Sequence, residues 1–489
     1  MMEYRSTRGG GAVDAPRALM EGLAADRGLY VPAAWPEFDW RSALQGDEYA
    51  MEARILEALM PGCADEEMIR RAYAGKFTDG QLCPLKAVGD VWAMELYHGP
   101  TSAFKDVALT MLPHLMSRAR QGQGSRRVSI LTATSGDTGK AALEGFHDVE
   151  GTGIAVFYPE KGVSQVQRLQ MATQEGRNVR VCAVRGNFDD CQSAVKEAFL
   201  RLSAQLPPEE ALSSANSINI GRLMPQITYY FACYAELCRR GEIRLGETVN
   251  FSVPTGNFGD ILAGYYAKKL GLPVGRLLCA SNENHVLTDF FRTGVYDKRR
   301  PFRLTTSPSM DILVSSNLER LLFDGCGEDA GQVRGFMERL EREGSFCIGG
   351  DMLRRLRESF EADYCTEEET AEEIARLWRE RRYLCDPHSA VGFACGRRYR
   401  EQSGDGRPMV VLSTASPFKF PAAVLAALGE REEGDEFAGM ARLAALTGQT
   451  PPPALAALRE KRVLHRDVID REEIVDYVAR WLREEGAPC

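Results

Sequence analysis

Residues 128–146 read VSILTATSGDTGKAALEGF, and this stretch decides the fold class. It begins with an apolar run over 128–131, continues through a loop of hydroxyl and glycine residues, and becomes a helical pattern from Ala141. A continuous apolar run, rather than one that alternates with polar residues, is typical of a strand buried on both faces. The stretch therefore predicts a strand, a loop and a helix of a parallel α/β sheet.

The same order recurs from about residue 91 onward. Further strands are expected over 91–96, 153–158, 179–184, 249–253, 277–280 and 409–412, and helices include 103–118, 223–238 and 261–270. Apolar strands separated by helices imply a mostly parallel sheet that is covered on both faces. The expected fold class is therefore α/β and doubly wound.

Changes in pattern divide the chain into regions. Residues 1–90 carry helical patterns over 15–27 and 49–60, so we predict a small N-terminal domain. We assign 91–240 to a small α/β lobe and 241–489 to a large one. Within the large lobe, charge-rich amphipathic patterns predict a helical insertion at about 311–382, with helices over 333–340, 352–360 and 370–382.

Composition narrows the functional classes. The 489 residues include 60 Lys+Arg and 69 Asp+Glu, a net charge of −9, so nucleic acid is not expected as the principal ligand. Apolar runs are far shorter than the roughly 18 residues that span a bilayer, and no secretory signal opens the chain, so we expect a cytoplasmic protein without membrane contact. Thirteen cysteines without C-x-x-C and six scattered histidines predict reduced core thiols and no metal site.

Four strand-to-helix loops carry the chemistry, because ligands bind beyond the carboxyl ends of parallel strands. The loop HGPTSAFKD over 98–106 places Lys105 in the first turn of a helix. A cation there opposes the helix dipole, which lowers its pKa and favours the neutral amine that attacks an aldehyde or abstracts a proton. The alternative is an exposed lysine whose stem covers apolar surface.

The loop TATSGDTGK over 132–140 suits an anion, since small residues and helix N–H groups approach it closely. It is not a Walker loop, because Thr134 stands at the first glycine position and Ala141 at the position of the magnesium-binding hydroxyl. It is not a nucleophile elbow either, since Ala133 replaces the first glycine of G-x-S-x-G.

The loop VPTGNFGD over 253–260 predicts a cup for a single phosphate. Its glycines lack the G-x-G-x-x-G spacing of a dinucleotide site, and a tight turn is the alternative explanation. The fourth loop, LSTASPFKF over 412–420, offers a neutral hydroxyl or simply a helix cap. An amine, a phosphate cup, an anion loop and a hydroxyl together are what pyridoxal phosphate with an amino-acid substrate requires.

With these motifs the chain resembles the threonine synthase family, pyridoxal-phosphate enzymes of fold type II. The resemblance runs almost end to end, over 6–9, 28–32, 98–106, 135–139, 216–222, 254–260, 282–284 and 288–291. It implies two doubly wound α/β lobes of that fold plus the small N-terminal domain. It also implies that pyridoxal 5'-phosphate is the cofactor and that Lys105 carries the Schiff base to it.

The resemblance implies further site residues. The cup for the cofactor phosphate would consist of Gly256, Asn257, Phe258, Gly259 and Asp260, and Thr414 would bond the pyridine nitrogen. The substrate carboxylate would be received by Ser135, Gly136, Asp137, Thr138 and Gly139, and the substrate phosphate by Asn219 and Arg222.

The family's reaction converts O-phospho-L-homoserine and water to L-threonine and phosphate, which makes the expected enzyme a carbon–oxygen lyase acting on phosphate. Lys105 would serve as general base at the α-carbon of this small-molecule substrate, and the departing phosphate would assist as a base. The expected oligomer is a monomer or homodimer.

The sequence departs from the family at the fourth loop, which usually reads S/G-T-A-H-P-x-K-F. Ser416 replaces the histidine and Phe418 a small residue, which puts rate or specificity in question. A phospho-lyase or dehydratase that releases a 2-oxo acid is therefore the alternative within the cofactor class. A phospho-ligand sensor and a P-loop kinase are alternatives from other classes, and the broken Walker pattern argues against the kinase. His388, in a stretch that matches the family, has either a structural or a catalytic role.

Overall fold

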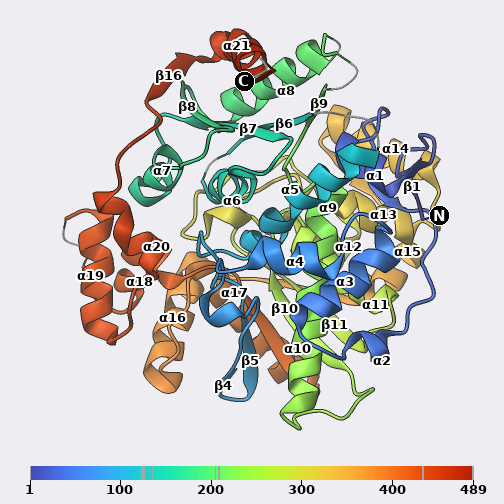
Figure 1. Cartoon of the computed structure of the whole chain (residues 1–489). Helices are drawn as coiled ribbons and strands as arrows, with labels where there is room; N and C mark the ends of the chain where they lie inside the picture. Colours follow the sequence, from blue (N-terminus) through green and yellow to red (C-terminus); the bar gives the residue numbers. More distant parts are fainter. Residues whose placement is uncertain are drawn as a thin grey trace.

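The computed structural model describes residues 2–122, 127–134, 136–203, 205–207, 210–431 and 434–486. Two largely parallel sheets form its centre, and helices cover both faces of each sheet (Figure 1). This arrangement confirms the predicted α/β class, and the predicted strands all occur. No helix in the described part of the chain is long and apolar enough to cross a bilayer.

The smaller sheet has five parallel strands in the order β16-β8-β7-β6-β9. They are β6 (Arg127–Ala133), β7 (Thr152–Pro159), β8 (Val179–Arg185), β9 (Glu210–Ser213) and β16 (Asp467–Asp470). Helices α5 (Lys105–Gly122) and α6 (Asp137–Phe146) cover one face, and α8 (Phe188–Ser203) and α21 (Ile474–Gly486) cover the other. Consecutive side chains of a strand point to opposite faces, so Ile130 packs with the first helix pair and Leu131 with the second.

The larger sheet has six strands in the order β14-β11-β10-β15-β5-β4, and only the β4–β5 pair is antiparallel. They are β4 (Leu85–Val88), β5 (Val91–Glu95), β10 (Val249–Pro254), β11 (Val274–Ser281), β14 (Phe360–Tyr364) and β15 (Met409–Ser413). Helix α17 (Pro387–Ser403) packs on β10, β11 and β15, while α11 (Gly259–Lys269) packs on β10 and β11.

Two strands pair across the lobe limits that the sequence predicts. β5, placed in the 91–240 lobe, pairs with β15 of the larger sheet, and β16, placed in the 241–489 lobe, pairs with β8 of the smaller one. Hydrogen-bond partners hundreds of residues apart leave no local sequence signal. The predicted residue limits of the domains therefore do not coincide with membership of the sheets.

The helix predicted over 352–360 is wrong at its end. Helix α15 ends at Arg357, and Phe360 begins β14, which pairs in parallel with β11. The Phe360 ring is buried against Phe258, Phe291 and Tyr265, so tertiary packing decides the strand where the local pattern continued a helix. The segment 311–382 is thus not wholly helical, because it supplies an edge strand of the larger sheet.

Residues before 80 form a small antiparallel sheet and several helices at one side of the molecule (Figure 1). The sheet consists of β1 (Glu3–Ser6), β2 (Val13–Asp14) and β3 (Tyr30–Pro32), and the helices are α1 (Ala15–Glu21), α2 (Trp40–Ala43), α3 (Glu48–Leu59) and α4 (Glu66–Tyr73). Elements that follow the sheets' strands include α7 (Gln165–Ala172), α12 (Val286–Thr293), β12 (Val295–Asp297), α13 (Leu318–Gly325), α14 (Ala330–Glu343), β13 (Ser345–Cys347), α15 (Gly350–Arg357), α16 (Glu367–Arg381), α18 (Pro421–Ala427), α19 (Glu436–Thr447) and α20 (Pro453–Ala456).

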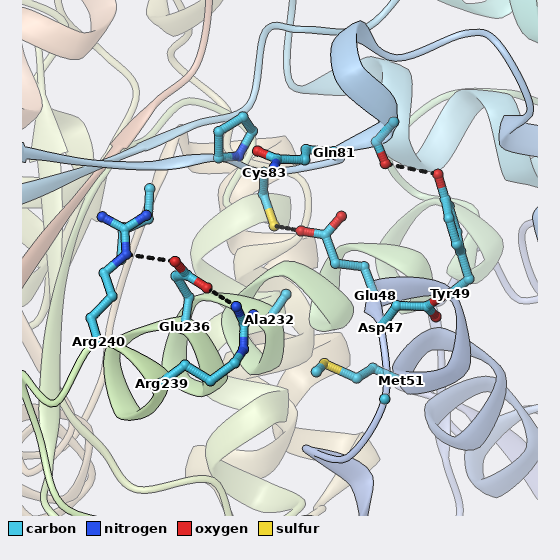
Figure 2. A pocket seen from close by; sticks show the side chains of 14 residues that line it. Asp47, Glu48, Tyr49, Met51, Gln81, Cys83, Ala232, Glu236, Arg239 and Arg240 are labelled. Atoms are coloured by element: carbon cyan, nitrogen blue, oxygen red, sulfur yellow. Dashed lines mark hydrogen bonds and ion pairs between the residues drawn. The ribbon is translucent and has the colours of Figure 1, made fainter.

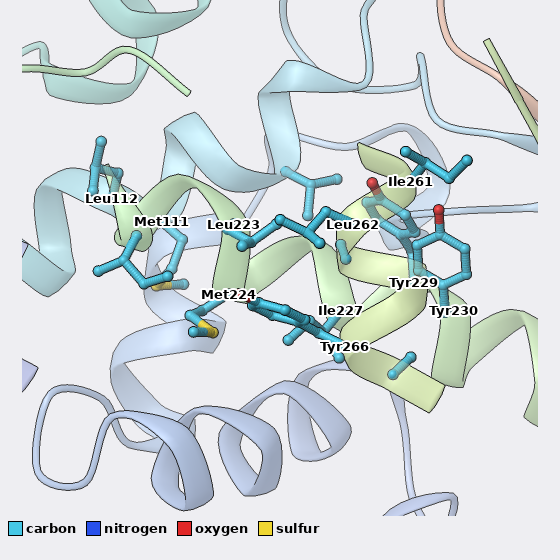
Figure 3. Close-up of a cluster of buried hydrophobic side chains, with 14 of the residues drawn as sticks. Met111, Leu112, Leu223, Met224, Ile227, Tyr229, Tyr230, Ile261, Leu262 and Tyr266 are labelled. Carbon is cyan, nitrogen blue, oxygen red and sulfur yellow. The ribbon is translucent and has the colours of Figure 1, made fainter. Parts of the chain in front are cut away.

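A buried apolar cluster joins α5 to the helices beneath the larger sheet. Besides α5 and α11 it includes α9 (Ile220–Leu223), the 3₁₀ turn η2 (Met224–Gln226) and α10 (Ile227–Arg239). Figure 3 shows its side chains, among them Met111, Leu112, Leu223, Met224, Ile227, Ile261 and Leu262. Each fully buried side chain of this size stabilises the fold by about 1.5–3 kcal/mol, so this packing stabilises the position of the helix that begins at Lys105.

The packing of α5 against α6 predicts the effect of one added methyl group. A Cβ at Gly145 would lie 1.9 Å from the carbonyl oxygen of Leu109, so Gly145→Ala forces the helices apart and should destabilise the protein by about 1–3 kcal/mol. The control Gly335→Ala in α14 meets only the Nη1 atom of Arg339 at 3.9 Å and should stabilise by about 0.5–1 kcal/mol through helix propensity. Urea unfolding measures both, and equal stabilities would contradict the close packing.

Candidate active site

The loops predicted to carry chemistry meet at one place. Neighbouring strands β5, β15 and β10 run parallel, so their carboxyl ends bring the loops 98–104, 414–420 and 255–258 to the same edge of the larger sheet. The Phe104 N–H donates to the Thr414 carbonyl at 2.8 Å, which ties the first loop to the fourth. The loop after β6 arrives from the smaller sheet, and its Asp137 lies 3.7 Å from Lys105.

Lys105 is the first residue of α5 and is 9% exposed. Its Nζ donates to the Oγ atom of Ser309 at 3.2 Å. Burial lowers the pKa of this lysine; the nearby Asp137 carboxylate partly opposes that effect, while Lys419 and Arg222 lower the pKa further. The position at a helix N-terminus acts in the same direction, since the dipole disfavours a cation there. The lysine is thus suited to react as a neutral amine.

Asp137 lies between two lysines. Its side chain accepts a hydrogen bond from the Lys419 Nζ at 2.7 Å and another from Gln167 at 3.1 Å. Burial alone would raise the pKa of Asp137, but Lys419 and Lys105 hold it well below its usual range. Lys419 also donates to the Thr101 carbonyl at 3.0 Å, so it fixes the 98–106 loop as well. The Asp137 carboxylate is therefore a counter-ion of the two amines, and only its backbone N–H suits an anionic ligand.

The 135–139 loop has some backbone N–H groups that are already hydrogen-bonded and others that could bind an anion. The Thr134 hydroxyl accepts from the N–H groups of Gly136 and Gly139 at 3.1 and 3.0 Å, so these two donors are engaged within the loop. In the described part of the chain, neither the Asp137 nor the Thr138 N–H has a protein acceptor. Both stand at the start of α6, where N–H groups attract anions. Ser135 lies outside the described residues.

The loop from Gly256 to Asp260 forms a cup of N–H groups at the start of α11. Its carbonyls are held from behind, since Ser315 Oγ donates to the Gly256 carbonyl at 2.8 Å and Asn317 donates to that of Asn257 at 2.9 Å. Within the described ranges the N–H groups of Asn257, Phe258 and Gly259 find no protein acceptor. Phe258 takes a left-handed conformation with φ of 63°, which turns successive N–H groups the same way, as in other anion-binding loops.

The two cup glycines have different surroundings. A Cβ at Gly256 would lie 2.6 Å from the Ser309 carbonyl oxygen, so packing of the protein excludes any larger residue there. A Cβ at Gly259 would come no closer than 3.5 Å to a protein atom, and its φ is not in the left-handed region. Protein packing therefore does not explain Gly259, whereas a ligand seated against the backbone would.

Asp260 is buried under the cup rather than exposed to it. Tyr229 and Tyr230 both donate to its Oδ1 atom, while Oδ2 is buried without a partner in the described structure. Burial raises the pKa of Asp260 to about 7, although the two tyrosines and Lys105 act to lower it. A carboxyl that holds a proton near neutral pH avoids the repulsion between a carboxylate and a phosphate.

Thr414 follows β15 with its backbone fixed on both sides. Its carbonyl accepts from Phe104, and its N–H donates to the Ser389 Oγ at 3.1 Å. Its hydroxyl makes no hydrogen bond with the described residues, so it is available to a ligand. The next turn carries Ser416, which is buried and caps the 3₁₀ turn η4 (Pro417–Lys419) by accepting from the Phe418 N–H at 3.4 Å.

Asn219 and Arg222 differ in what they leave free. The Asn219 side chain caps α9, accepting from Gly221 at 2.9 Å and donating to the carbonyls of Leu19 and Ser214. Its hydrogen-bonding capacity is thus used within the fold. Arg222 is buried, donates from Nη1 to Ala215 and leaves its Nε atom without a partner. Burial lowers the pKa of Arg222 to about 10, and no carboxylate pairs with it in the described structure.

Several functional neighbours escaped the sequence analysis. Ser309, Ser389 and Lys419 contact Lys105, Thr414 and Asp137, respectively. Asp386 in turn accepts from the backbone N–H of Ser389. Lys419 had a weak signal, because it lies in the same loop as Thr414. Ser309 had none, since it belongs to the short turn η3 (Pro308–Met310) that follows no strand of the larger sheet.

A separate cavity of about 280 Å³ lies between α3, the start of β4 and α10 (Figure 2). Its charged groups are already engaged, as Glu236 pairs with Arg239 and Arg240, and Glu48 accepts from the Cys83 thiol at 3.2 Å. It contains none of the residues predicted for catalysis or binding.

Comparison with family models gives three matches. The model described as "Pyridoxal-phosphate dependent enzyme" matches residues 81–415, which is more than half of the chain. "Threonine synthase N terminus" matches residues 3–73, and "Threonine synthase, C-terminal" matches residues 389–475.

Curated relatives agree with these models. The threonine synthase of Pseudomonas aeruginosa is 40% identical over 434 residues, which cover 86% of this chain and 90% of that protein. Threonine synthase-like 1 of Pongo abelii is 39% identical over 456 residues, or 89% of this chain. The match spans only 61% of the length of that relative.

Solved structures share the whole fold. A threonine synthase from Brucella melitensis, described as bound to pyridoxal phosphate, superposes with a TM-score of 0.86 at 39% identity and covers 99% of this chain and 100% of that one. A yeast threonine synthase gives a TM-score of 0.87 at 31% identity, with 99% of each chain covered.

The buried Asp260 predicts a pH dependence of stability. Its folded pKa of about 7 lies above the unfolded value of about 3.9, so its contribution is fully present below pH 4 and is lost as pH rises through 7. Asp260→Asn carries no such proton and should gain stability relative to the unmodified protein between about pH 4 and 7, with a constant difference above.

Urea unfolding of both proteins across this range measures the effect. The control Asp351→Asn changes an exposed carboxylate in α15 and should show no comparable trend. A stability difference that stays constant between pH 5 and 7 would contradict the assignment of a proton to Asp260.

Proposed function

The chain belongs to the threonine synthase family of pyridoxal-phosphate-dependent enzymes, and we propose that it converts O-phospho-L-homoserine and water to L-threonine and phosphate. The observation that carries this proposal is a buried amine with separate anion sites around it. Lys105 lies beside the start of α6, and the pKa of Lys105 is lowered further by Arg222, which has no carboxylate partner in the described part of the chain. One substrate with both a carboxylate and a phosphate suits this distribution of charge.

The residues present fit the cofactor. The N–H cup at the start of α11 suits one phosphate, and the open space above Gly259 is what a bound phosphate needs. Lys105, whose pKa is lowered by burial, suits a bond to the cofactor's aldehyde, and the free hydroxyl of Thr414 suits the ring nitrogen. When bound, pyridoxal phosphate supplies an electron sink for negative charge that develops at the substrate's carbon atoms.

The chain's own residues then hold the substrate and move its protons. We assign the substrate carboxylate to the free N–H groups of Asp137 and Thr138, with Gly136 and Gly139 shaping the loop. The Lys105 Nζ removes and returns the proton at the α-carbon, a role that the burial-lowered pKa of this amine favours. The ion pair between Asp137 and Lys419 keeps the Asp137 carboxylate in position beside the Lys105 amine.

Arg222 is the residue we assign to the substrate phosphate. A buried guanidinium that has no carboxylate partner among the described residues is costly, and a phosphate dianion would relieve that cost. Asn219 supports it indirectly by capping the helix that carries Arg222. The phosphate released beside Arg222 would then serve as the base that activates the water adding at the β-carbon.

The competing activity is elimination without water addition, which releases a 2-oxo acid. Ser416 is the observation that favours it, because the family usually has a histidine at this position and Ser416 here only caps a turn.

A cytoplasmic location and a monomeric or homodimeric state remain predictions from the sequence.

Product identity tests the proposed reaction. Purified protein loaded with pyridoxal phosphate and given O-phospho-L-homoserine should release phosphate and L-threonine in equal amounts. Chromatography of the amino acids, with a parallel phosphate assay, measures both. The Lys105→Ala variant should lose activity by at least about 10³-fold, because it lacks the amine that moves the proton. Formation of 2-oxobutyrate in place of threonine would establish the elimination activity instead.

The space above Gly259 tests the cofactor cup. Gly259→Val places a Cβ no closer than 3.5 Å to any described protein atom outside its own helix, so stability should change by less than about 1 kcal/mol while the Kd for pyridoxal phosphate rises at least about tenfold. The control is Gly350→Val, also at the first residue of a helix, where an added Cβ would meet no described atom within 4 Å. Absorbance titration measures the Kd, and an unchanged affinity in Gly259→Val would contradict the placement of the phosphate.

A further inference from the structure

Ser309 reaches the site lysine from a distant part of the chain. Its Oγ atom accepts a hydrogen bond from the Lys105 Nζ at 3.2 Å, although 204 residues separate the two. The backbone of the same serine packs on the cup, since its carbonyl oxygen is the atom that a Cβ on Gly256 would strike. The turn η3 therefore touches both the lysine and the phosphate cup.

His388 holds this turn through its backbone. The Ser309 N–H donates to the His388 Nε2 atom at 3.1 Å, so Nε2 carries no proton. The proton must then be on Nδ1, which lies 2.7 Å from the Asp386 Oδ1 atom and donates to it. The ring is buried and packs against Phe420 at 5.0 Å. Both nitrogens of the histidine are thus used to join Ser309 to Asp386.

Asp386 connects the lysine to the fourth loop as well. It is fully buried at the start of α17, and its Oδ2 atom accepts from the Ser389 hydroxyl. The Ser389 Oγ in turn accepts the N–H of Thr414 at 3.1 Å. One carboxylate therefore anchors two chains of hydrogen bonds, which end at Lys105 and at the backbone of Thr414.

We propose that Ser309 is a positioning residue that directs the Lys105 amine, and that His388 and Asp386 hold Ser309 in register for this task. The inference rests on the proposed function in that Lys105 is the reactive amine. A lysine side chain has four rotatable bonds, so its amine needs a fixed partner whenever it is not bonded to the cofactor. The Asp137 carboxylate at 3.7 Å supplies charge, but Ser309 supplies the closer and directional contact.

The charges around the amine predict what loss of the hydroxyl does. Asp137 on α6 and Asp106 on α5 favour the ammonium form, while Lys419 on η4 and Arg222 on α9 disfavour it. The Ser309 oxygen accepts from the amine and so favours the ammonium form too. Ser309→Ala should therefore shift the titration of Lys105 to lower pH, whereas Ser309→Thr keeps a hydroxyl and should restore it.

Labelling of Lys105 in the full-length, cofactor-free protein tests this without any turnover. Acetic anhydride reacts with the neutral amine, and mass spectrometry of the peptide gives the labelled fraction at each pH. The midpoint should fall in Ser309→Ala and return in Ser309→Thr. The control is Ser307→Ala in the same segment, whose hydroxyl bonds Asn282 and Thr305 but not Lys105, and it should leave the midpoint unchanged. Equal shifts in the two alanine variants would overturn the proposal.

Turnover of the loaded enzyme adds a second readout. Ser309→Ala should lower kcat about tenfold to a hundredfold and change KM by less than about threefold, because a misdirected amine slows proton transfer but does not loosen substrate. The folded content and cofactor affinity of each variant accompany these values. A rise in KM at constant kcat would overturn the assignment to positioning.

Two single variants of His388 and one double variant test whether His388 acts on Lys105 through Ser309. His388→Leu removes the acceptor for the Ser309 N–H and should shift the Lys105 midpoint as Ser309→Ala does, while the amide oxygen of His388→Gln can still accept and should restore part of it. In Ser309→Ala/His388→Leu the shift should equal that of Ser309→Ala alone, since His388 acts through the serine. If the midpoint shifts of the two single variants add in the double variant, His388 does not act through Ser309, and this part of the proposal is overturned.

These outcomes are independent of the proposed reaction. If the protein forms no threonine but the labelling midpoint still shifts as described, the proposed function fails and the role of Ser309 stands. If threonine is formed and the midpoint does not move, the proposed function stands and the role of Ser309 fails.

Discussion

The burial of the Lys105 amine is the constraint on which the rest of the site depends. A cation removed from water at a helix N-terminus is unfavourable unless other groups compensate for it, and here only one carboxylate, Asp137, lies within 4 Å in the described structure. Lys419 shares that carboxylate, so the pair of lysines is undercompensated. The site therefore favours a neutral amine and anionic ligands, which are the two conditions that the proposed chemistry needs.

The same constraint explains why two sheets are required. The lysine loop and the hydroxyl loop come from neighbouring strands of the larger sheet, whereas the carboxylate that balances the lysine comes from the loop after β6 in the smaller one. The apolar cluster of Figure 3 holds the lysine's helix between them. The charge balance at Lys105 therefore depends on how the two sheets are placed relative to each other.

Much of this was predictable where the signal is local. Lys105, the glycines of the cup and Thr414 each follow an apolar strand and precede a helix, and the carboxyl ends of parallel strands meet at one edge. Ser309 and Asp386 were not predictable in this way, because their partners are 204 residues away in the first case and depend on a histidine tautomer in the second. β14 and β16 were missed for the same reason, since edge strands take their identity from the strand they join.

The sequence by itself determined the α/β class, the family and the chemical types that gather at the site, because these follow from short motifs and their order. Only the tertiary structure decided which atoms are free. It showed that the Asn219 side chain caps α9, and that the Arg222 Nε atom has no partner among the described residues. It also showed that a Cβ on Gly259 would come no closer than 3.5 Å to the described protein atoms outside its helix. The physical reason is that a hydrogen bond is a property of two groups at a given distance and angle, and sequence specifies only one group at a time.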